Sequence, residues 1–342
     1  MRIHIVGMGS VGRRHFKIAH EVFPDSEIQV SSSREFVNAE FSMYSQNLES
    51  HSTETPSPNL VVIATPSSFH VDIANRMLDV GAHLLIEKPV SNSSQGVAQL
   101  IKKSEEKRLV MMVGYNLRYL QSLVEFRSLL DESTVGTPLS VRAEAGHYLP
   151  HWRPEQDYRE TVSARKELGG GVLLELSHEI DYLRWIFGEV DWVRATLTKQ
   201  SNLEINVEDT AHIVLGFSKR SQSRQLIGSL NLDFIRHDST RNCTVIGETG
   251  TLRWDGNKGS VSLLKKGHKD WQVLYLDNGS MDESYISEWK DLKNSIELNS
   301  KPRVSGVDGL RVIEVVEAAR VSAVTGQQID VQRTLFPIGS QN

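Results

Sequence analysis

The sequence predicts an α/β domain with a parallel sheet, followed by an α+β domain whose sheet is open and mostly antiparallel. Three features predict this order. Short apolar runs alternate with helical segments up to about residue 114, as in right-handed βαβ units. A glycine-rich turn separates the first apolar run from the first helical segment. Beyond residue 190, alternating apolar and polar residues indicate strands of a sheet with one buried face.

The first domain is expected to span residues 1–118. Its first strand is an apolar run at residues 2–6 that a glycine ends, which is typical of a buried parallel strand. Residues 41–58 are rich in Ser, Thr and Pro, and we expect a loop there. The other expected elements are helices at residues 11–22, 71–80 and 94–107, and strands at residues 27–30, 59–64, 83–86 and 109–114.

The second domain is expected to span residues 119–342. One continuous helix is expected directly after three consecutive glycines, at residues 172–187. The remaining expected elements are a helix at residues 121–130, a strand at 139–145, an irregular stretch at 147–168, alternating strands over 190–276, and helices at 286–298 and 309–325.

Composition excludes some classes of protein. Of the 342 residues, 39% are hydrophobic and 24% charged, with a formal net charge of −5, so no basic excess is available to bind nucleic acid. No apolar run approaches the roughly 18 residues of a membrane span, and no signal peptide is evident, so we expect a cytoplasmic protein. Cys243, the single cysteine, lies in an alternating stretch and is expected to be a buried structural thiol.

Gly7, Gly9 and Gly12 form a G-x-G-x-x-G motif between the first strand and the first helix. In a Rossmann domain such glycines permit a tight turn, close approach to a pyrophosphate, and close packing of the helix. The N–H groups of the following turn, at Ser10 and Val11, would bind the phosphates. A dinucleotide site is therefore predicted; a purely structural turn is the alternative.

The end of the second strand bears on which nicotinamide cofactor binds. An enzyme that uses NAD usually carries an acidic residue there, which binds the ribose 2′-hydroxyl. This chain instead has three serines and an arginine there, namely Ser31, Ser32, Ser33 and Arg34. Hydroxyls followed by a guanidinium suit a 2′-phosphate, so NADP is favoured over NAD. The alternative is a polar surface turn.

Two further motifs contain candidate catalytic residues. Glu87 and Lys88 precede a proline at the end of the fourth expected strand, where ligands bind in open α/β sheets, so Lys88 can donate to a substrate hydroxyl. Glu175, His178 and Asp181 recur every three residues, on one face of the expected helix. A histidine between carboxylates is a candidate general base. A surface turn and a polar helix stripe are the alternatives, and a metal site is not expected because no metal-ligand signature is present.

Together these motifs resemble the Gfo/Idh/MocA family of oxidoreductases. The resemblance includes Thr65 and Pro66 with His70 nearby, Asn116 and Arg118 after Gly114, and an Asp-Gly-Leu-Arg-Val sequence from residue 308. It implies a Rossmann domain, a second domain with an open sheet, and a final helix at residues 309–325 that packs back on the first domain. It also implies homodimers or homotetramers formed through the exposed sheet face.

The resemblance implies that Lys88 and His178 form a catalytic pair. It assigns Thr65, Pro66, His70, Glu87 and Lys88 to the cofactor site, and Asn116, Arg118, Glu175 and Asp181 to the substrate site. The family's usual aspartate stands four residues before the histidine, where this chain has Leu174. Because Glu175 stands only three residues before it, the role of Glu175 is left open.

Aromatic and basic residues crowd into residues 147–166, among them Tyr148, Trp152, Arg153 and Arg165. Aromatic rings stack on sugars and guanidiniums bind carboxylate or phosphate, so an anionic sugar is expected: a nucleotide sugar, a sugar acid or a sugar phosphate. The alternative is a solvated loop. The expected reaction is reversible hydride transfer between a secondary carbinol and NAD(P). A non-catalytic NAD(P)-binding regulator and a cofactor-assisted sugar eliminase or hydrolase are the alternatives.

Overall fold

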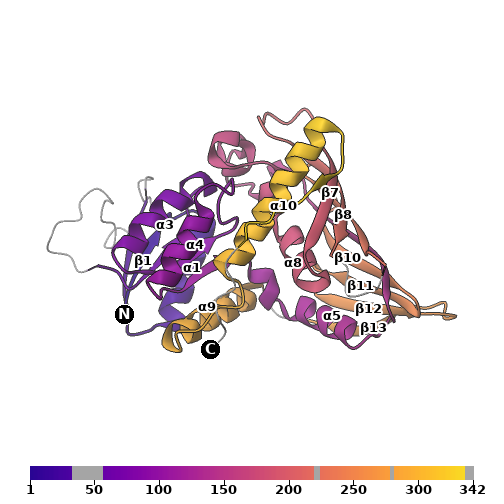
Figure 1. Cartoon of the computed structure of the whole chain (residues 1–342), viewed down its shortest axis with the longest axis horizontal. Helices are drawn as coiled ribbons and strands as arrows, with labels where there is room; N and C mark the ends of the chain where they lie inside the picture. Colours follow the sequence, from indigo (N-terminus) through magenta and orange to yellow (C-terminus); the bar gives the residue numbers. More distant parts are fainter. Residues whose placement is uncertain (33–56, 219–223, 278–280, 336–342) are drawn as a thin grey trace.

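The computed structural model describes residues 1–32, 57–218, 224–277 and 281–335, and contains two sheets on opposite sides of a long helix, α10 (Figure 1). The first sheet is parallel and five-stranded, in the order β2-β1-β3-β4-β5. Its core strands are almost fully buried. The strands are β1 (Arg2–Val6), β2 (Glu27–Ser31), β3 (Leu60–Ile63), β4 (His83–Glu87) and β5 (Met111–Gly114).

The strand order places a switch point between β1 and β3. From β1 the chain continues to β2 on one side and then to β3 on the other, so the turns after β1 and β3 leave in opposite directions. Ligands of open α/β sheets bind at such a point. The helices of this domain are α1 (Ser10–Val22), η1 (Ser67–Phe69), α3 (His70–Asp79) and α4 (Val97–Glu106).

The second sheet has nine strands in the order β13-β12-β11-β10-β6-β9-β8-β7-β14, and only β6 and β9 pair in parallel. Together the two sheets confirm the predicted fold class. Cys243 lies on the covered face and is fully buried, which raises the pKa of its thiol and agrees with a structural role. The strands are β6 (Pro138–Gly146), β7 (Val190–Thr198), β8 (Thr210–Phe217), β9 (Ile227–Asp233), β10 (Thr240–Gly247), β11 (Gly250–Asp255), β12 (Ser260–Lys265), β13 (Gln272–Leu276) and β14 (Ile329–Asp330).

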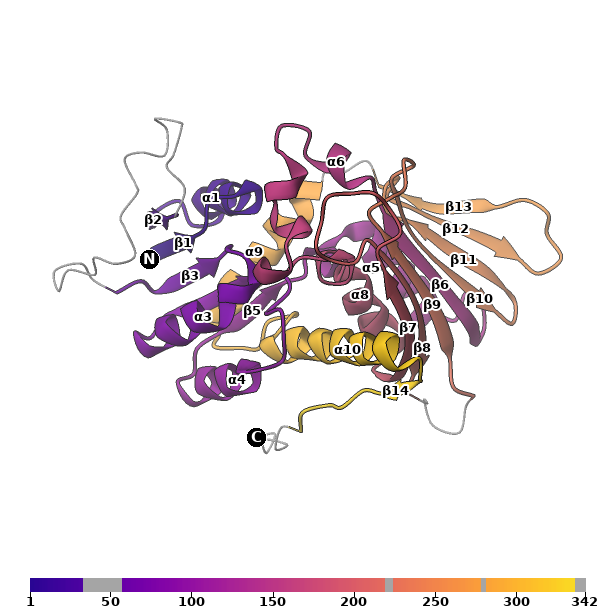
Figure 2. The same cartoon turned by 90° about the horizontal axis from the view of Figure 1, so that it is seen from above.

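Helix α10 (Gly306–Thr325) lies between the two sheets (Figure 2) and contacts β7 on one side and α4 and β5 on the other. It begins with a capping box, in which the main-chain N–H and the hydroxyl of Ser305 both donate to Oδ2 of Asp308. The other helices of this half are η2 (Asn116–Tyr119), α5 (Gln121–Asp131), α6 (Leu149–Trp152), η3 (Tyr158–Glu160), η4 (Val162–Ala164), η5 (Lys166–Leu168), α7 (Val172–Glu175), α8 (His178–Phe187) and α9 (Met281–Glu297).

The prediction of one continuous helix over residues 172–187 is wrong. The chain forms α7 and α8, separated at Leu176 and Ser177. Here the N–H of Ser177 bonds to the carbonyl of Leu174, and the N–H of Glu179 bonds to that of Leu176. These i to i−3 bonds tighten the chain where an α-helix would have i to i−4 bonds. Glu175 and His178 therefore belong to different helices.

Candidate active site

The turn after β1 fits a bound pyrophosphate. Gly7 has φ of +97°, and a Cβ there would lie 2.5 Å from the carbonyl oxygen of Ala64, so only glycine is accommodated. A Cβ on Gly9, in contrast, would meet no atom within 4 Å. The first turn of α1, which includes Ser10 and Val11, has no side-chain cap and no acidic residue. Its N–H groups are thus available to an anion.

Part of the predicted cofactor-selecting segment lies outside the described residues, namely Ser33 and Arg34. Ser31, at the end of β2, is buried and its hydroxyl is 2.7 Å from Nε2 of His4. Ser32 follows directly and is partly exposed. The preference for NADP over NAD therefore stays a prediction.

Glu87, at the end of β4, is bound by the protein itself. Its Oε1 is 2.6 Å from Nε2 of His15, and its Oε2 accepts from the N–H of Lys88. Burial alone would raise the pKa of Glu87, but the hydrogen bond from His15 and the charge of Lys88 hold it below its ordinary value. Nδ1 of His15 accepts from the indole N–H of Trp289 in α9. Glu87 thus anchors the main chain of the neighbouring lysine.

His70 connects the turns that follow β3 and β4. Its Nε2 is 2.8 Å from the carbonyl oxygen of Thr65, and its Nδ1 is 3.0 Å from that of Pro89. The ring is almost fully buried, which lowers its pKa. Thr65 and Pro66 are partly exposed at the switch point, where the cofactor assignment places them. His70 therefore fixes the position of the turns around the predicted nicotinamide site.

Lys88 contacts the break between α7 and α8. Its Nζ donates to the main-chain oxygen of Glu175 at 2.7 Å, and lies 3.8 Å from the Oε2 of the same residue. In a continuous helix that oxygen would accept from the N–H of Glu179, which bonds to Leu176 instead. The break thus provides an acceptor for the lysine, and leaves two of its three N–H donors for other partners.

His178 begins α8 and lies against Tyr115, with ring centroids 5.5 Å apart. It is buried, and its Nδ1 has no hydrogen-bond partner among the described residues. Burial, with the positive charges of Lys88 and Arg241, lowers its pKa well below the ordinary value. The imidazole is therefore neutral at physiological pH, as a general base must be before it accepts a proton.

Residues from the end of the second sheet complete the site. His147, after β6, lies against Trp152 with ring centroids 4.0 Å apart and the ring planes tilted by 54°, and Arg153 lies over the same indole. Burial, with the charges of Arg241, Lys88 and Arg153, lowers the pKa of His147 to about 4. Its Nε2 is buried without a partner among the described residues. Two neutral histidines thus lie within a group of cations.

Two residues of this group, Arg241 and Glu179, were not predicted from the sequence. Nε of Arg241 donates to Oε1 of Glu179 at 2.7 Å, and Glu179 is fully buried in α8. The proximity of Glu179 to His178 in the sequence was a usable signal. Arg241 offered none, because it lies in an ordinary strand and comes near the site only through the pairing of β10 with β6.

Other predicted substrate residues are bonded within the protein. Arg118 and Asp181 form a buried two-point ion pair with N–O distances of 2.6 and 2.8 Å. Asn116 donates to the hydroxyl of Ser284. Arg165 is exposed and donates to a main-chain oxygen of its own loop. Tyr148 makes an edge-to-face contact with His151 and a tilted ring contact with His237. Substrate binding by these side chains stays a prediction.

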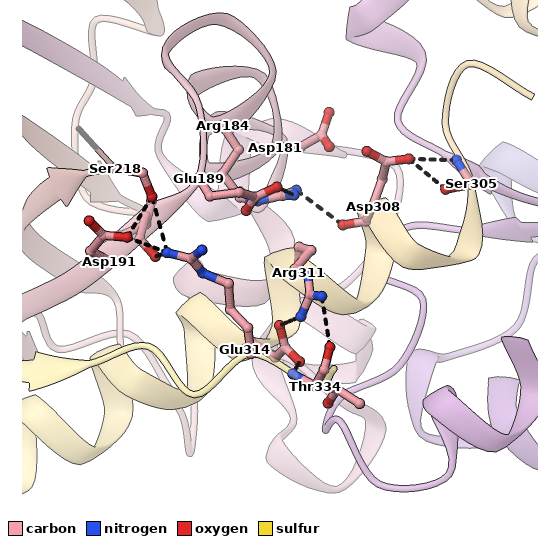
Figure 3. A network of polar contacts seen from close by, with 12 residues as sticks. Asp181, Arg184, Glu189, Asp191, Ser218, Ser305, Asp308, Arg311, Glu314 and Thr334 are labelled. Carbon is pink, nitrogen blue, oxygen red and sulfur yellow. Dashed lines mark hydrogen bonds and ion pairs between the residues drawn. The ribbon is translucent and has the colours of Figure 1, made fainter. Parts of the chain in front are cut away.

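The expectation that Glu175, His178 and Asp181 share one helical face is also wrong. Glu175 precedes the helix break and reaches Lys88, whereas Asp181 points to Arg118. Figure 3 shows the neighbouring polar network, in which Arg184 of the same helix bonds to Glu189 and to the main chain of Asp308. Within the described part of the chain, no three His, Cys, Asp or Glu residues are placed to hold a metal ion.

Comparison with known proteins identifies the fold and its family. The NAD-binding Rossmann fold of an oxidoreductase family matches residues 1–115, and the C-terminal alpha/beta domain of the same family matches residues 127–331. The chain belongs to the Gfo/Idh/MocA oxidoreductase family. This confirms the resemblance inferred from the motifs. Across the described residues of this family member, no helix has the length and apolar character of a membrane span.

Several dehydrogenases align with nearly the whole chain. Myo-inositol 2-dehydrogenase of Thermotoga maritima is 22% identical and covers 98% of this chain and 100% of its own length. A structure of levoglucosan dehydrogenase with NADH and levoglucosan has a TM-score of 0.82 at 20% identity, covering 98% and 100% of the two chains. The WlbA dehydrogenase from Bordetella pertussis, in complex with NADH and UDP-GlcNAcA, has a TM-score of 0.78 at 20% identity, covering 98% and 99%.

Proposed function

We propose that the protein is an NAD(P)-dependent dehydrogenase that transfers hydride to or from a secondary carbinol of a sugar or sugar derivative. The observation that carries this proposal is the placement of Lys88 beside a neutral, buried His178, at the carboxyl end of the parallel sheet. The named relatives, dehydrogenases of inositols and of levoglucosan, support the same class of reaction.

In the oxidative direction, His178 accepts the hydroxyl proton of the substrate while Lys88 donates a hydrogen bond to the same oxygen. The bound nicotinamide supplies the hydride acceptor. The oxygen of Glu175 and the main-chain anchor at Glu87 hold the lysine in position. Tyr115 packs on the imidazole and donates from its hydroxyl to Ser177, which orients the ring and the helix break together.

Steady-state kinetics of His178→Ala and Lys88→Met test this proposal. Each variant should lose about 10²- to 10⁴-fold in kcat, because a positioned proton-transfer group typically contributes that much. Binding of NAD(P)H, followed by its fluorescence, should remain. His268→Ala, in an exposed turn, is the matched control. Full activity of both site variants would contradict the mechanism, and turnover without a net change in NAD(P)H would favour an eliminase or hydrolase.

We propose NADP as the preferred cofactor, because Ser32, Ser33 and Arg34 follow β2 without an acidic residue. Thermal unfolding with NADPH and NADH measured side by side is the test, since a ligand at 100 times its Kd adds about 2.7 kcal/mol of stability. Arg34→Ala should weaken NADPH binding and leave NADH binding unchanged. A preference of the unmodified protein for NADH would contradict the assignment.

We propose an anionic sugar as the substrate: a nucleotide sugar, a sugar acid or a sugar phosphate. Lys88, Arg153 and Arg241 all act on His147, so positive charge gathers where the sugar would lie. Trp152 is partly exposed beside His147 and offers a ring face. Activity assays with matched anionic and neutral sugars test this choice, and equal rates with both would contradict it.

We also propose that the protein is a cytoplasmic homodimer or homotetramer that associates through the open face of the large sheet. This face carries the exposed side chain of Val214 and a polar hollow of about 500 Å³ lined by Arg142, Asn242 and Arg253. Light scattering after gel filtration measures the mass in solution. Val214→Glu should shift an oligomer toward monomers, and a monomeric unmodified protein would contradict the proposal.

A further inference from the structure

Arg241 lies near the beginning of β10, on the covered face of the large sheet. It pairs with Ala145 of β6, one residue before the end of that strand, and lies on the same face as the buried Cys243. The direction of its side chain is set by Glu179, whose Oε1 accepts from Nε at 2.7 Å. The carboxylate is fully buried, whereas the arginine side chain is 21% exposed.

The outer edge of this guanidinium has no hydrogen-bond partner in the part of the chain that the structure describes. Nη1 and Nη2 of Arg241 make no hydrogen bond with any of the described residues, and Glu179 accepts a hydrogen bond only from Nε. The two nitrogens present parallel N–H groups, a geometry that matches a carboxylate. Glu179 thus fixes the orientation of the guanidinium through Nε, and the edge formed by Nη1 and Nη2 can bind a ligand.

Arg241 is connected to the reacting groups through Glu179, which directly follows His178 in α8. The charge of Arg241 acts on both His178 and His147, the two site histidines with unpartnered ring nitrogens. The charge of Lys88 acts on the same two rings. An anion bound by the guanidinium edge of Arg241 therefore lies next to the start of α8, where His178 stands. This position suits an anionic group carried by the reacting sugar itself.

We infer that the substrate is a sugar acid whose carboxylate, on the ring that is oxidised or reduced, is bound by the Nη1 and Nη2 groups of Arg241. Glu179 is the positioning residue that holds the guanidinium in place. This inference rests on the proposed dehydrogenase function and specifies its substrate class. The same chemistry is present in a free sugar acid and in a sugar acid carried by a nucleotide.

Calorimetric titration of the NAD(P)H complex tests the inference without requiring turnover. The probes are D-glucuronate, D-galacturonate and UDP-D-glucuronate, each paired with its neutral counterpart, D-glucose, D-galactose and UDP-D-glucose. The unmodified protein should bind at least one acid more tightly than its neutral partner. Arg241→Gln should weaken binding of that acid by about 100-fold, as expected for hydrogen bonds to a charged group. It should change the affinity for the neutral sugar by less than about 3-fold.

Three further variants separate recognition from folding. Arg241→Lys keeps the charge beside Glu179 but lacks the fork, so it should bind the acid with intermediate affinity. Glu179→Gln should raise KM for the acid more than it lowers kcat, since it loosens the arginine and leaves the reacting groups in place. Arg76→Gln, on the exposed face of α3, is the charge-matched control and should bind as the unmodified protein does.

The outcomes distinguish this inference from the proposed function. Two outcomes would overturn the role of Arg241 and leave the dehydrogenase function intact. One is equal affinity of the unmodified protein for acids and neutral sugars. The other is that Arg241→Gln and Arg241→Lys each lose as much affinity for the neutral sugar as for the acid. Binding of NAD(P)H without binding of any sugar would count against both. Tight binding of the UDP-sugar acid alone would retain the role of Arg241 and identify the nucleotide-carried form.

Discussion

At the scale of single residues, the tautomer of His15 follows from its neighbours. The indole N–H of Trp289 can only donate, so Nδ1 of His15 must accept and the proton lies on Nε2. From there it is donated to Glu87, whose other oxygen holds the N–H of Lys88. A tryptophan of the second half of the chain therefore helps to position Lys88, the proposed catalytic lysine, in the first half.

Trp289→Phe should remove the hydrogen bond to His15 while keeping an aromatic ring in the core. The ring remains, but Nδ1 of the fully buried His15 loses its donor, which should cost about 1–3 kcal/mol of stability. We also expect a reduced kcat with nearly unchanged KM, because Lys88 is anchored less firmly. Urea unfolding and kinetics measure both effects. Trp271→Phe, at an exposed position, is the control, and equal behaviour of the two variants would refute the anchoring role.

His147 makes the stability of the protein depend on pH. A free histidine titrates near 6.5, whereas burial and the charges of Arg241, Lys88 and Arg153 lower the pKa of His147 to about 4. Between these values the unfolded chain binds a proton that the folded chain does not, so stability falls as pH drops from 6.5 to 4. His147→Asn should unfold with a shallower pH slope in urea titrations, and an unchanged slope would contradict the assignment.

At the scale of elements, the break between α7 and α8 shows where local pattern stops being informative. The residues on either side of it continue a helical period, so the sequence predicts one helix. The break is stabilised by groups from distant parts of the chain, Lys88 on the oxygen of Glu175 and the Tyr115 hydroxyl on Ser177. Such tertiary contacts override local propensity and cannot be inferred from local pattern.

The same break sets the effect of replacing Glu175. Its main-chain oxygen, at 2.7 Å, is the close partner of Lys88, and its carboxylate oxygen is more distant, at 3.8 Å. Glu175→Gln should therefore lower kcat by less than about 10-fold, compared with the 10²- to 10⁴-fold expected for Lys88→Met. Steady-state kinetics of the two variants decide the matter. Equal losses would mean that the carboxylate, rather than the helix break, positions the lysine.

At the scale of the whole molecule, the sequence predicts both sheets, because each depends on a repeated pattern that is present in the chain. It also predicts the glycine turn and the two catalytic candidates, which follow from motifs. The network that joins distant segments was not predicted: Arg118 binds Asp181 of α8 and Asp308 of α10, nearly 200 residues away in sequence. The same side chains that resemble substrate ligands in the sequence are thereby placed between elements, as structural ion pairs.

Replacing Arg118 distinguishes these two roles. Its side chain is 4% exposed and that of Asp181 is 1% exposed, so Arg118→Met leaves a carboxylate buried without its partner. Such a change costs about 3–5 kcal/mol, whereas replacing both members by apolar residues costs much less. Arg118→Met should therefore unfold at markedly lower urea concentration, and Arg118→Met with Asp181→Leu should recover part of the loss. If Arg118→Met is instead as stable as an Arg76→Met control and only its KM for the sugar rises, the arginine binds substrate.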